Sequence, residues 1–108
     1  MRKAKDIFPA PADGFALAPV HPGEILKEEI AARGLTANAV ALKLRVPANR
    51  LTDIVNGKRG ISPDTALRLA RFFGPGAGVW MTLQSQWDLA EAERANGARI
   101  KAEVERAA

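Results

Sequence analysis

Two short apolar stripes joined by a tight turn constrain the fold of this chain more than any other feature. Between Leu35 and Asn56 the sequence reads LTANAVALKLRVPANRLTDIVN. Its first half follows the i, i+3, i+4, i+7 spacing of one helix face, with Ala37, Val40, Ala41 and Leu44. After a turn at Arg45 and Val46, Pro47 opens a second segment whose inner stripe is Leu51, Ile54 and Val55. The pattern predicts two short helices that cross closely, with Thr36 as the N-cap of the first.

Start and stop signals predict three further helices. Pro22 suits a first helical turn, and Gly34 is expected to end that helix as a left-handed cap. Ser62-Pro63-Asp64 is a strong start signal for a helix that runs to about Phe73. A fifth helix is expected to begin near Gly78. The fold class is therefore all-α, with five helices and no strand of consequence.

The chain divides into three predicted parts. Residues 1–19 hold three of the seven prolines, lack helical periodicity and are expected to form a flexible N-terminal arm. Residues 20–89 form the helical domain. Residues 90–108 alternate charges with alanines, which predicts a helical or partly disordered tail that Gly97 interrupts. A chain of 108 residues fits one small domain with such extensions.

Charge is distributed unevenly along the chain, whose net charge is +4. One acid, Asp53, stands among five cations in the region of the paired helices: Lys43, Arg45, Arg50, Lys58 and Arg59. Acids gather elsewhere, near Glu24 and again from Asp88 to Glu105. One basic face is expected, which suits a polyanionic partner such as a nucleic acid.

Several classes of function are excluded or disfavoured. The chain has no cysteine, which rules out disulfides, thiol catalysis and cysteine-ligated zinc. It has no long apolar run or signal peptide, so we expect a cytoplasmic protein without a membrane partner. The single histidine, His21, lies at a helix entry and suits a capping or structural role. We expect no enzyme, no metal site and no cofactor.

The outward side of the second paired helix carries the candidate base contacts: Ala48, Asn49, Thr52 and Asp53. In a helix-turn-helix this second helix enters the DNA major groove with its N-terminus first. Asn49 suits a bidentate contact with adenine, and Ala48 suits a thymine methyl group. Asp53 suits a cytosine amino group, or it repels phosphates in wrong registers. A helical hairpin without a DNA role has the same periodicity and stays open as an alternative.

The candidate phosphate contacts flank that helix: Thr36, Arg45, Arg50, Asn56, Lys58 and Arg59. Thr36 would present its hydroxyl and nearby backbone N–H groups at the N-terminus of the first paired helix. The cations would supply the salt-dependent part of the affinity.

The fifth helix carries a candidate dimer interface made of Trp80, Leu83 and Trp87. The two tryptophans are seven residues apart, which places them two turns apart on one face. They suit either the core or an interface, where tryptophan is enriched. We expect a mixed role, with Trp80 inside and Trp87 near a twofold axis.

From Val20 to Leu89 the chain resembles the HigA-type antitoxins, within the Cro/C1-like (XRE, lambda-repressor-like) helix-turn-helix family. The matching segments are HPGEIL, VPANRLTDIVNGKRGIS, DTALRLARFFG and VWMTLQSQWDL. The resemblance implies a five-helix domain that binds a palindromic double-stranded DNA operator as a homodimer. It also implies a partner toxin, usually a small basic endoribonuclease, which the antitoxin neutralises while it represses their shared operon.

Three positions depart from the wider family pattern. Arg45 stands where many members have a glycine, and a left-handed arginine costs about 1 kcal/mol. Ala37 replaces a glutamine that holds a phosphate, and Ala39 replaces the glutamate of a capping box. These departures predict weak affinity for a single half-site and make dimerisation more important.

Two other functions remain open at this point. One is a stand-alone Cro/C1-like transcriptional repressor without a toxin. The other is a toxin-binding module with weak DNA binding. A neighbouring gene for a small basic protein would separate the antitoxin from the first alternative, and a salt-sensitive gel shift on its promoter would separate it from the second.

Overall fold

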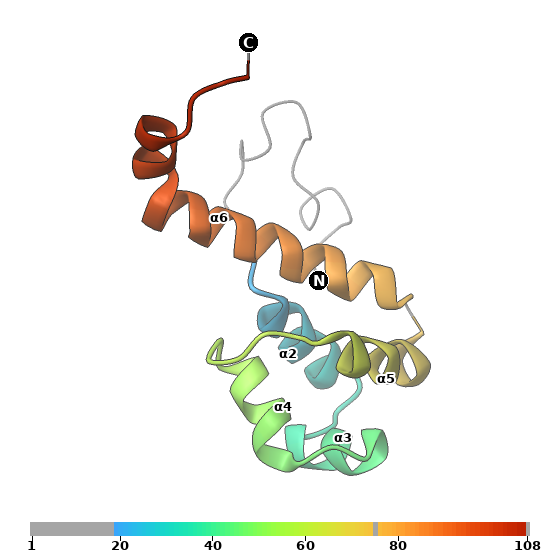
Figure 1. Cartoon of the computed structure of the whole chain (residues 1–108). Coiled ribbons are helices and arrows are strands. Elements are labelled where there is room, and N and C mark those ends of the chain that lie inside the picture. Colours follow the sequence, from blue (N-terminus) through green and yellow to red (C-terminus); the bar gives the residue numbers. More distant parts are fainter. Residues whose placement is uncertain (1–18, 75, 108) are drawn as a thin grey trace.

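The protein is a stack of short helices beneath one long helix (Figure 1). The computed structural model describes residues 19–74 and 76–107. Its helices are α2 (Pro22–Ala32), α3 (Ala37–Leu44), α4 (Ala48–Val55), α5 (Pro63–Phe73) and α6 (Ala77–Glu103). No strand occurs among these residues. The all-α, five-helix prediction is confirmed, whereas the arm predicted for residues 1–19 lies, except for Pro19, outside the described residues.

Side-chain caps fix most helix starts where the sequence predicts them. The Thr36 hydroxyl accepts a hydrogen bond from the Ala39 amide at 3.1 Å, and the Ser62 hydroxyl accepts one from the Thr65 amide at 3.3 Å. His21 caps α2, since its ring Nδ1 accepts from the Gly23 amide at 2.9 Å. Each cap satisfies one amide that lacks an intrahelical partner. Pro47 precedes α4 as its N-cap residue instead of occupying the first helical position.

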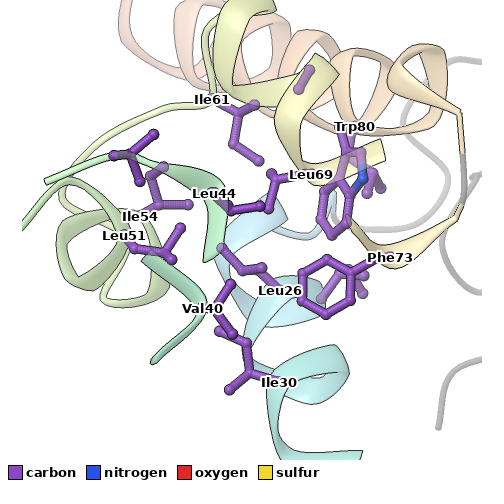
Figure 2. Packing of buried hydrophobic residues seen from close by; sticks show 14 of the residues in the cluster. Leu26, Ile30, Val40, Leu44, Leu51, Ile54, Ile61, Leu69, Phe73 and Trp80 are labelled. Atoms are coloured by element: carbon purple, nitrogen blue, oxygen red, sulfur yellow. The ribbon is translucent and has the colours of Figure 1, made fainter. Parts of the chain in front are cut away.

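All five helices contribute to one hydrophobic core (Figure 2). The most deeply buried side chains include Leu26 of α2, Val40 of α3, Leu51 and Ile54 of α4, Leu69 of α5, and Trp80 of α6. Ile61, in the segment between α4 and α5, joins the same cluster. Burial on this scale supplies the main favourable free energy of folding. It also holds α4 in place from its inner side.

A glycine allows α2 to lie directly against α4. A Cβ atom on Gly23 would lie 1.8 Å from the carbonyl oxygen of Ile54. No side chain fits at that distance, so only glycine permits this approach. The position of α4 therefore depends on a residue in the first turn of α2.

The long helix α6 has two halves with different surroundings. Trp80, Leu83 and Gln84 are its buried residues. The outer half of α6, defined here as residues 89–103, contains no buried residue, and Leu89 and Ile100 are 59% and 50% exposed. Figure 1 shows this half running past the other helices. Gly97 lies inside the helix and does not interrupt it, contrary to the prediction.

Among the described residues, no helix is long and apolar enough to span a bilayer.

Candidate nucleic-acid interface

The turn between α3 and α4 is built around Arg45. This residue adopts the left-handed conformation, with φ 62° and ψ 44°, a region of backbone space that favours glycine. The Arg45 amide donates to the Leu42 carbonyl at 3.2 Å, and the Val46 amide donates to the Ala41 carbonyl at 3.1 Å. These bonds close the C-terminus of α3 and turn the chain sharply into α4. The Arg45 side chain stays exposed beside the start of α4.

Helix α4 has a buried side and an exposed polar side. Leu51 and Ile54 are fully buried. Three of the four candidate base contacts (Ala48, Asn49 and Thr52) are exposed, and Asp53 is half-buried. The Thr52 hydroxyl donates to the Ala48 carbonyl at 3.1 Å, which leaves its oxygen lone pairs facing outward as acceptors. The exposed side of α4 therefore offers donors, acceptors and a methyl group to a partner.

A basic loop, defined here as Asn56–Gly60, follows α4. Its first half is held to the helix, because the Gly57 amide donates to Ile54 at 3.0 Å and the Lys58 amide to Asp53 at 2.8 Å. Gly57 has a φ of 75°, which favours glycine at this helix end. The Lys58 and Arg59 side chains are exposed. They are therefore available to an anionic partner.

Arg50 and Arg59 lie on an open hollow of about 370 Å³ between α4, the basic loop and the start of α5. The lining also includes Ser62, Asp64 and Thr65. Arg59 Nε lies 3.9 Å from the Asp53 carboxylate, a long and partly exposed ion pair. Such a pair stabilises the fold little, so Arg59 keeps most of its capacity for another anion.

Thr36 and Arg45 lie at opposite ends of α3, which is eight residues long. The Thr36 oxygen accepts from the Ala39 amide, so its hydroxyl proton is free to donate outward. Ala39 supplies no return bond to the cap, as predicted from the missing glutamate. The phosphate contacts proposed for these two residues remain predictions.

Packing within the single chain buries two of the three residues predicted to form the dimer interface. Trp80 and Leu83 are each 1% exposed and belong to the protomer's own core. They have almost no surface left for a second copy. Trp87 is half-buried, and its ring meets the His21 ring edge-on at a centroid distance of 5.2 Å. Trp87 therefore stays as the one member of that set with surface to offer.

Two polar residues that the sequence pattern does not identify stabilise the segments on either side of α4. Arg68 of α5 donates to the Leu44 carbonyl at 3.0 Å and so caps the C-terminus of α3. Gln84 of α6 accepts from the Ile61 amide at 2.7 Å, directly after the basic loop. Gln84 shares the helix face of Trp80, Leu83 and Trp87. A polar residue at an inward position was the signal that could have identified it.

No cluster of three or more potential metal ligands exists in the part of the chain that the structure describes.

Known proteins match both the sequence and this geometry. A family model described as helix-turn-helix matches residues 26–75. Virulence-associated protein I of Dichelobacter nodosus is 46% identical over 85 residues, which span 78% of this chain and 79% of that protein. A solved addiction module antidote protein of a HigA family from Coxiella burnetii is 44% identical, with a TM-score of 0.79. The match covers 84% of this chain and all of that one.

A second solved structure contains DNA. It is the Pseudomonas aeruginosa antitoxin HigA with the higBA promoter, 45% identical to this chain with a TM-score of 0.81. The match covers 83% of this chain and 99% of that one. Identity at this level over nearly the whole of the solved chains shows more than a shared fold. The chain belongs to the helix-turn-helix family and, within it, to the HigA-type antitoxins.

Proposed function

We propose that this chain is a sequence-specific DNA-binding antitoxin that represses its own operon. The observation that carries the proposal is the exposed polar side of α4, held rigid by fully buried Leu51 and Ile54 and followed at once by an exposed basic loop. A rigid helix with polar side chains suits the major groove, and flanking cations suit the phosphates. A similar antitoxin solved with its promoter supports the same assignment.

In this proposal the contacts divide by role. Ala48, Asn49, Thr52 and Asp53 face base edges, and the residues that face phosphates are Thr36, Arg45, Arg50, Asn56, Lys58 and Arg59. Asn49 reads adenine through two hydrogen bonds. A homodimer would place two copies of α4 about 34–36 Å apart, one helical turn of DNA. Trp87 is the residue we propose to lie near the twofold axis.

Two substitutions test the DNA-binding mode because they have different signatures. Asn49→Ala should cost about 1–3 kcal/mol of binding free energy and relax specificity at one base pair. Lys58→Ala should weaken binding to all DNA sequences alike. It should also lower the slope of log affinity against log salt concentration, called the salt slope below, by about one. Titrations of both variants against the promoter and a scrambled duplex, at several salt concentrations, measure these effects. If both variants bind every duplex as the parent does, α4 and the basic loop are not the DNA-binding surface.

We further propose that the partner is a small basic endoribonuclease toxin, whose activity this chain neutralises. The support is membership of the antitoxin family. Cells that express the adjacent small open reading frame should stop growing, and co-expression of this chain should restore growth. Without arrest, and with the neighbour demonstrably expressed, a stand-alone repressor would be the correct assignment. Rescue without any salt-sensitive promoter binding would instead indicate a toxin-binding module.

A further inference from the structure

A single buried amide side chain connects α6 to the end of the basic loop. Gln84 is 7% exposed. Its Oε1 accepts a hydrogen bond from the Ile61 amide at 2.7 Å across 23 residues of sequence. Its Nε2 donates to the Asp88 carboxylate at 2.9 Å, one turn further along α6. Both ends of the Gln84 amide are thus used.

The bond to Asp88 determines which way the Gln84 amide faces. A carboxylate only accepts hydrogen bonds, so it selects the NH₂ end of the side chain. The carbonyl end must then point toward Ile61, whose amide needs an acceptor. Asp88 is exposed and Gln84 is buried, so a surface carboxylate sets the orientation of a buried amide.

The backbone at Gly60 packs closely against the Gln84 side chain. A Cβ atom at Gly60 would lie 2.8 Å from Gln84 Nε2 and 3.0 Å from its Oε1. The loop backbone therefore lies directly on the amide plane, and the contact involves the residue next to Arg59. The close approach is specific to this place, because a Cβ at Gly57 in the same loop would meet nothing within 4 Å.

The basic loop is consequently fixed at two ends. The Lys58 amide bonds to the Asp53 carbonyl at the α4 end, and the Ile61 amide bonds to Gln84 at the other. The side chains of Lys58 and Arg59 project from the short segment between these anchors. A loop that is already ordered loses less conformational entropy when it binds a ligand.

We propose that Gln84 is a positioning residue for DNA binding, which holds the basic loop in the conformation that meets the phosphates. The inference rests on the proposed function. It assigns to α6, which has no predicted DNA contact of its own, a part in DNA affinity. Gln84 acts through the backbone of the loop, at Gly60 and Ile61.

The central test replaces Gln84 with an apolar side chain of similar size. Gln84→Met removes the acceptor for the Ile61 amide, and Gln86→Met on the same helix is the matched control. We expect Gln84→Met to bind the promoter about threefold to tenfold more weakly, the range expected when one hydrogen bond is removed. The salt slope should fall by about 0.9 for each phosphate that the loop no longer neutralises. If Gln84 only stabilised the fold, Gln84→Met would lower the midpoint of thermal unfolding. The folded protein would then keep the parent's salt slope for promoter binding.

A swap of hydrogen-bonding groups provides the rescue. The Gln84→Glu/Asp88→Asn double variant keeps an acceptor for the Ile61 amide and exchanges donor and acceptor between the two side chains. Promoter affinity and salt slope should return toward the parent values. Hydrogen exchange at the Ile61 amide should be fast in Gln84→Met and slow in the double variant.

A milder variant covers the case in which Gln84→Met does not fold. Asp88→Ala changes an exposed residue and removes the acceptor that orients the Gln84 amide, so promoter affinity should fall by up to about threefold and the salt slope should decrease. Faster exchange at Ile61 with parent-like affinity and salt slope, in either variant, would overturn the inference and leave the proposed function intact. A parent protein that binds promoter and scrambled duplex alike would overturn the proposed function itself, and the inference with it.

Discussion

The α4 helix and the outer half of α6 are both regular helices, but different forces maintain them. Helix α4 has eight residues, too few to be stable alone in water, and depends on buried Leu51 and Ile54. The outer half of α6 has no buried residue and depends on helix-forming residues and exposed ion pairs such as Arg94–Glu91 at 2.7 Å. Packing thus makes α4 rigid, whereas within the described residues the outer half of α6 is held by its own sequence.

The largest expected effect separates the inner and outer halves of α6. Trp80→Ala removes a fully buried side chain and should lower the free energy of unfolding by about 3–5 kcal/mol. Leu89→Ala, on the exposed half, should change it by no more than about 0.5 kcal/mol. Urea unfolding followed by circular dichroism measures both. Similar losses of stability for the two variants would show that the outer half packs against something beyond the described residues.

A second pair of substitutions tests how tightly α4 is held. Gly23→Ala places a methyl group against the Ile54 carbonyl and should destabilise the protein by about 1–3 kcal/mol through overpacking. Gly76→Ala is the matched control, since its Cβ would meet nothing within 4 Å. Thermal unfolding of both variants gives the comparison. An unchanged midpoint for Gly23→Ala would mean that α2 and α4 do not lie in contact.

The cap of α2 should make stability depend on pH. Burial lowers the pKa of His21 below its ordinary value of 6.5, while the charges of Glu24 and Asp88 act in the opposite direction. The neutral ring accepts a hydrogen bond from the Gly23 amide, so folding disfavours protonation of His21. This contribution is fully present above pH 6.5 and is lost as the pH falls through the lowered pKa.

The measurement is urea unfolding across this pH window. The His21→Asn variant keeps an acceptor at the cap and cannot titrate there, so its stability should fall less than that of the parent as the pH falls below 6.5. A parent that becomes more stable in this window would contradict the assigned direction of the shift.

The smallest effect concerns the outer half of α6. Gly97→Ala should stabilise the local helix by up to about 1 kcal/mol, because alanine loses less backbone entropy. The added Cβ would meet only the end of the flexible Glu93 side chain, which has room to move. Amide exchange near Gly97 should slow, with the global unfolding midpoint unchanged. A shift in the global midpoint would indicate that the outer half is coupled to the core.

The same contrast explains what the sequence could predict. The starts of α2, α3 and α5 follow from local signals. Pro22 opens α2, and the hydroxyls of Thr36 and Ser62 accept hydrogen bonds from amides three residues later. The left-handed Arg45 was expected from the family resemblance, because it stands where many members have a glycine. Periodicity also predicted the buried face of α4 from Leu51 and Ile54.

Contacts between distant segments were not predictable in this way. Gly23 and Gln84 have roles that depend on Ile54 and Ile61, which lie 31 and 23 residues away. Seven-residue spacing places Trp80 and Trp87 on one face of α6, but spacing does not say whether that face meets the core or a second copy. The buried state of Trp80 comes from the packing of α6 against α5 and α2.

The most direct test of the account is a map of backbone amide shifts during titration of the protein with its promoter, by nuclear magnetic resonance. We predict that the largest changes fall on α4 and the basic loop, with further changes at Thr36 and Arg45. The outer half of α6 should change little. Changes concentrated along the outer half of α6, with α4 and the basic loop unaffected, would contradict the account.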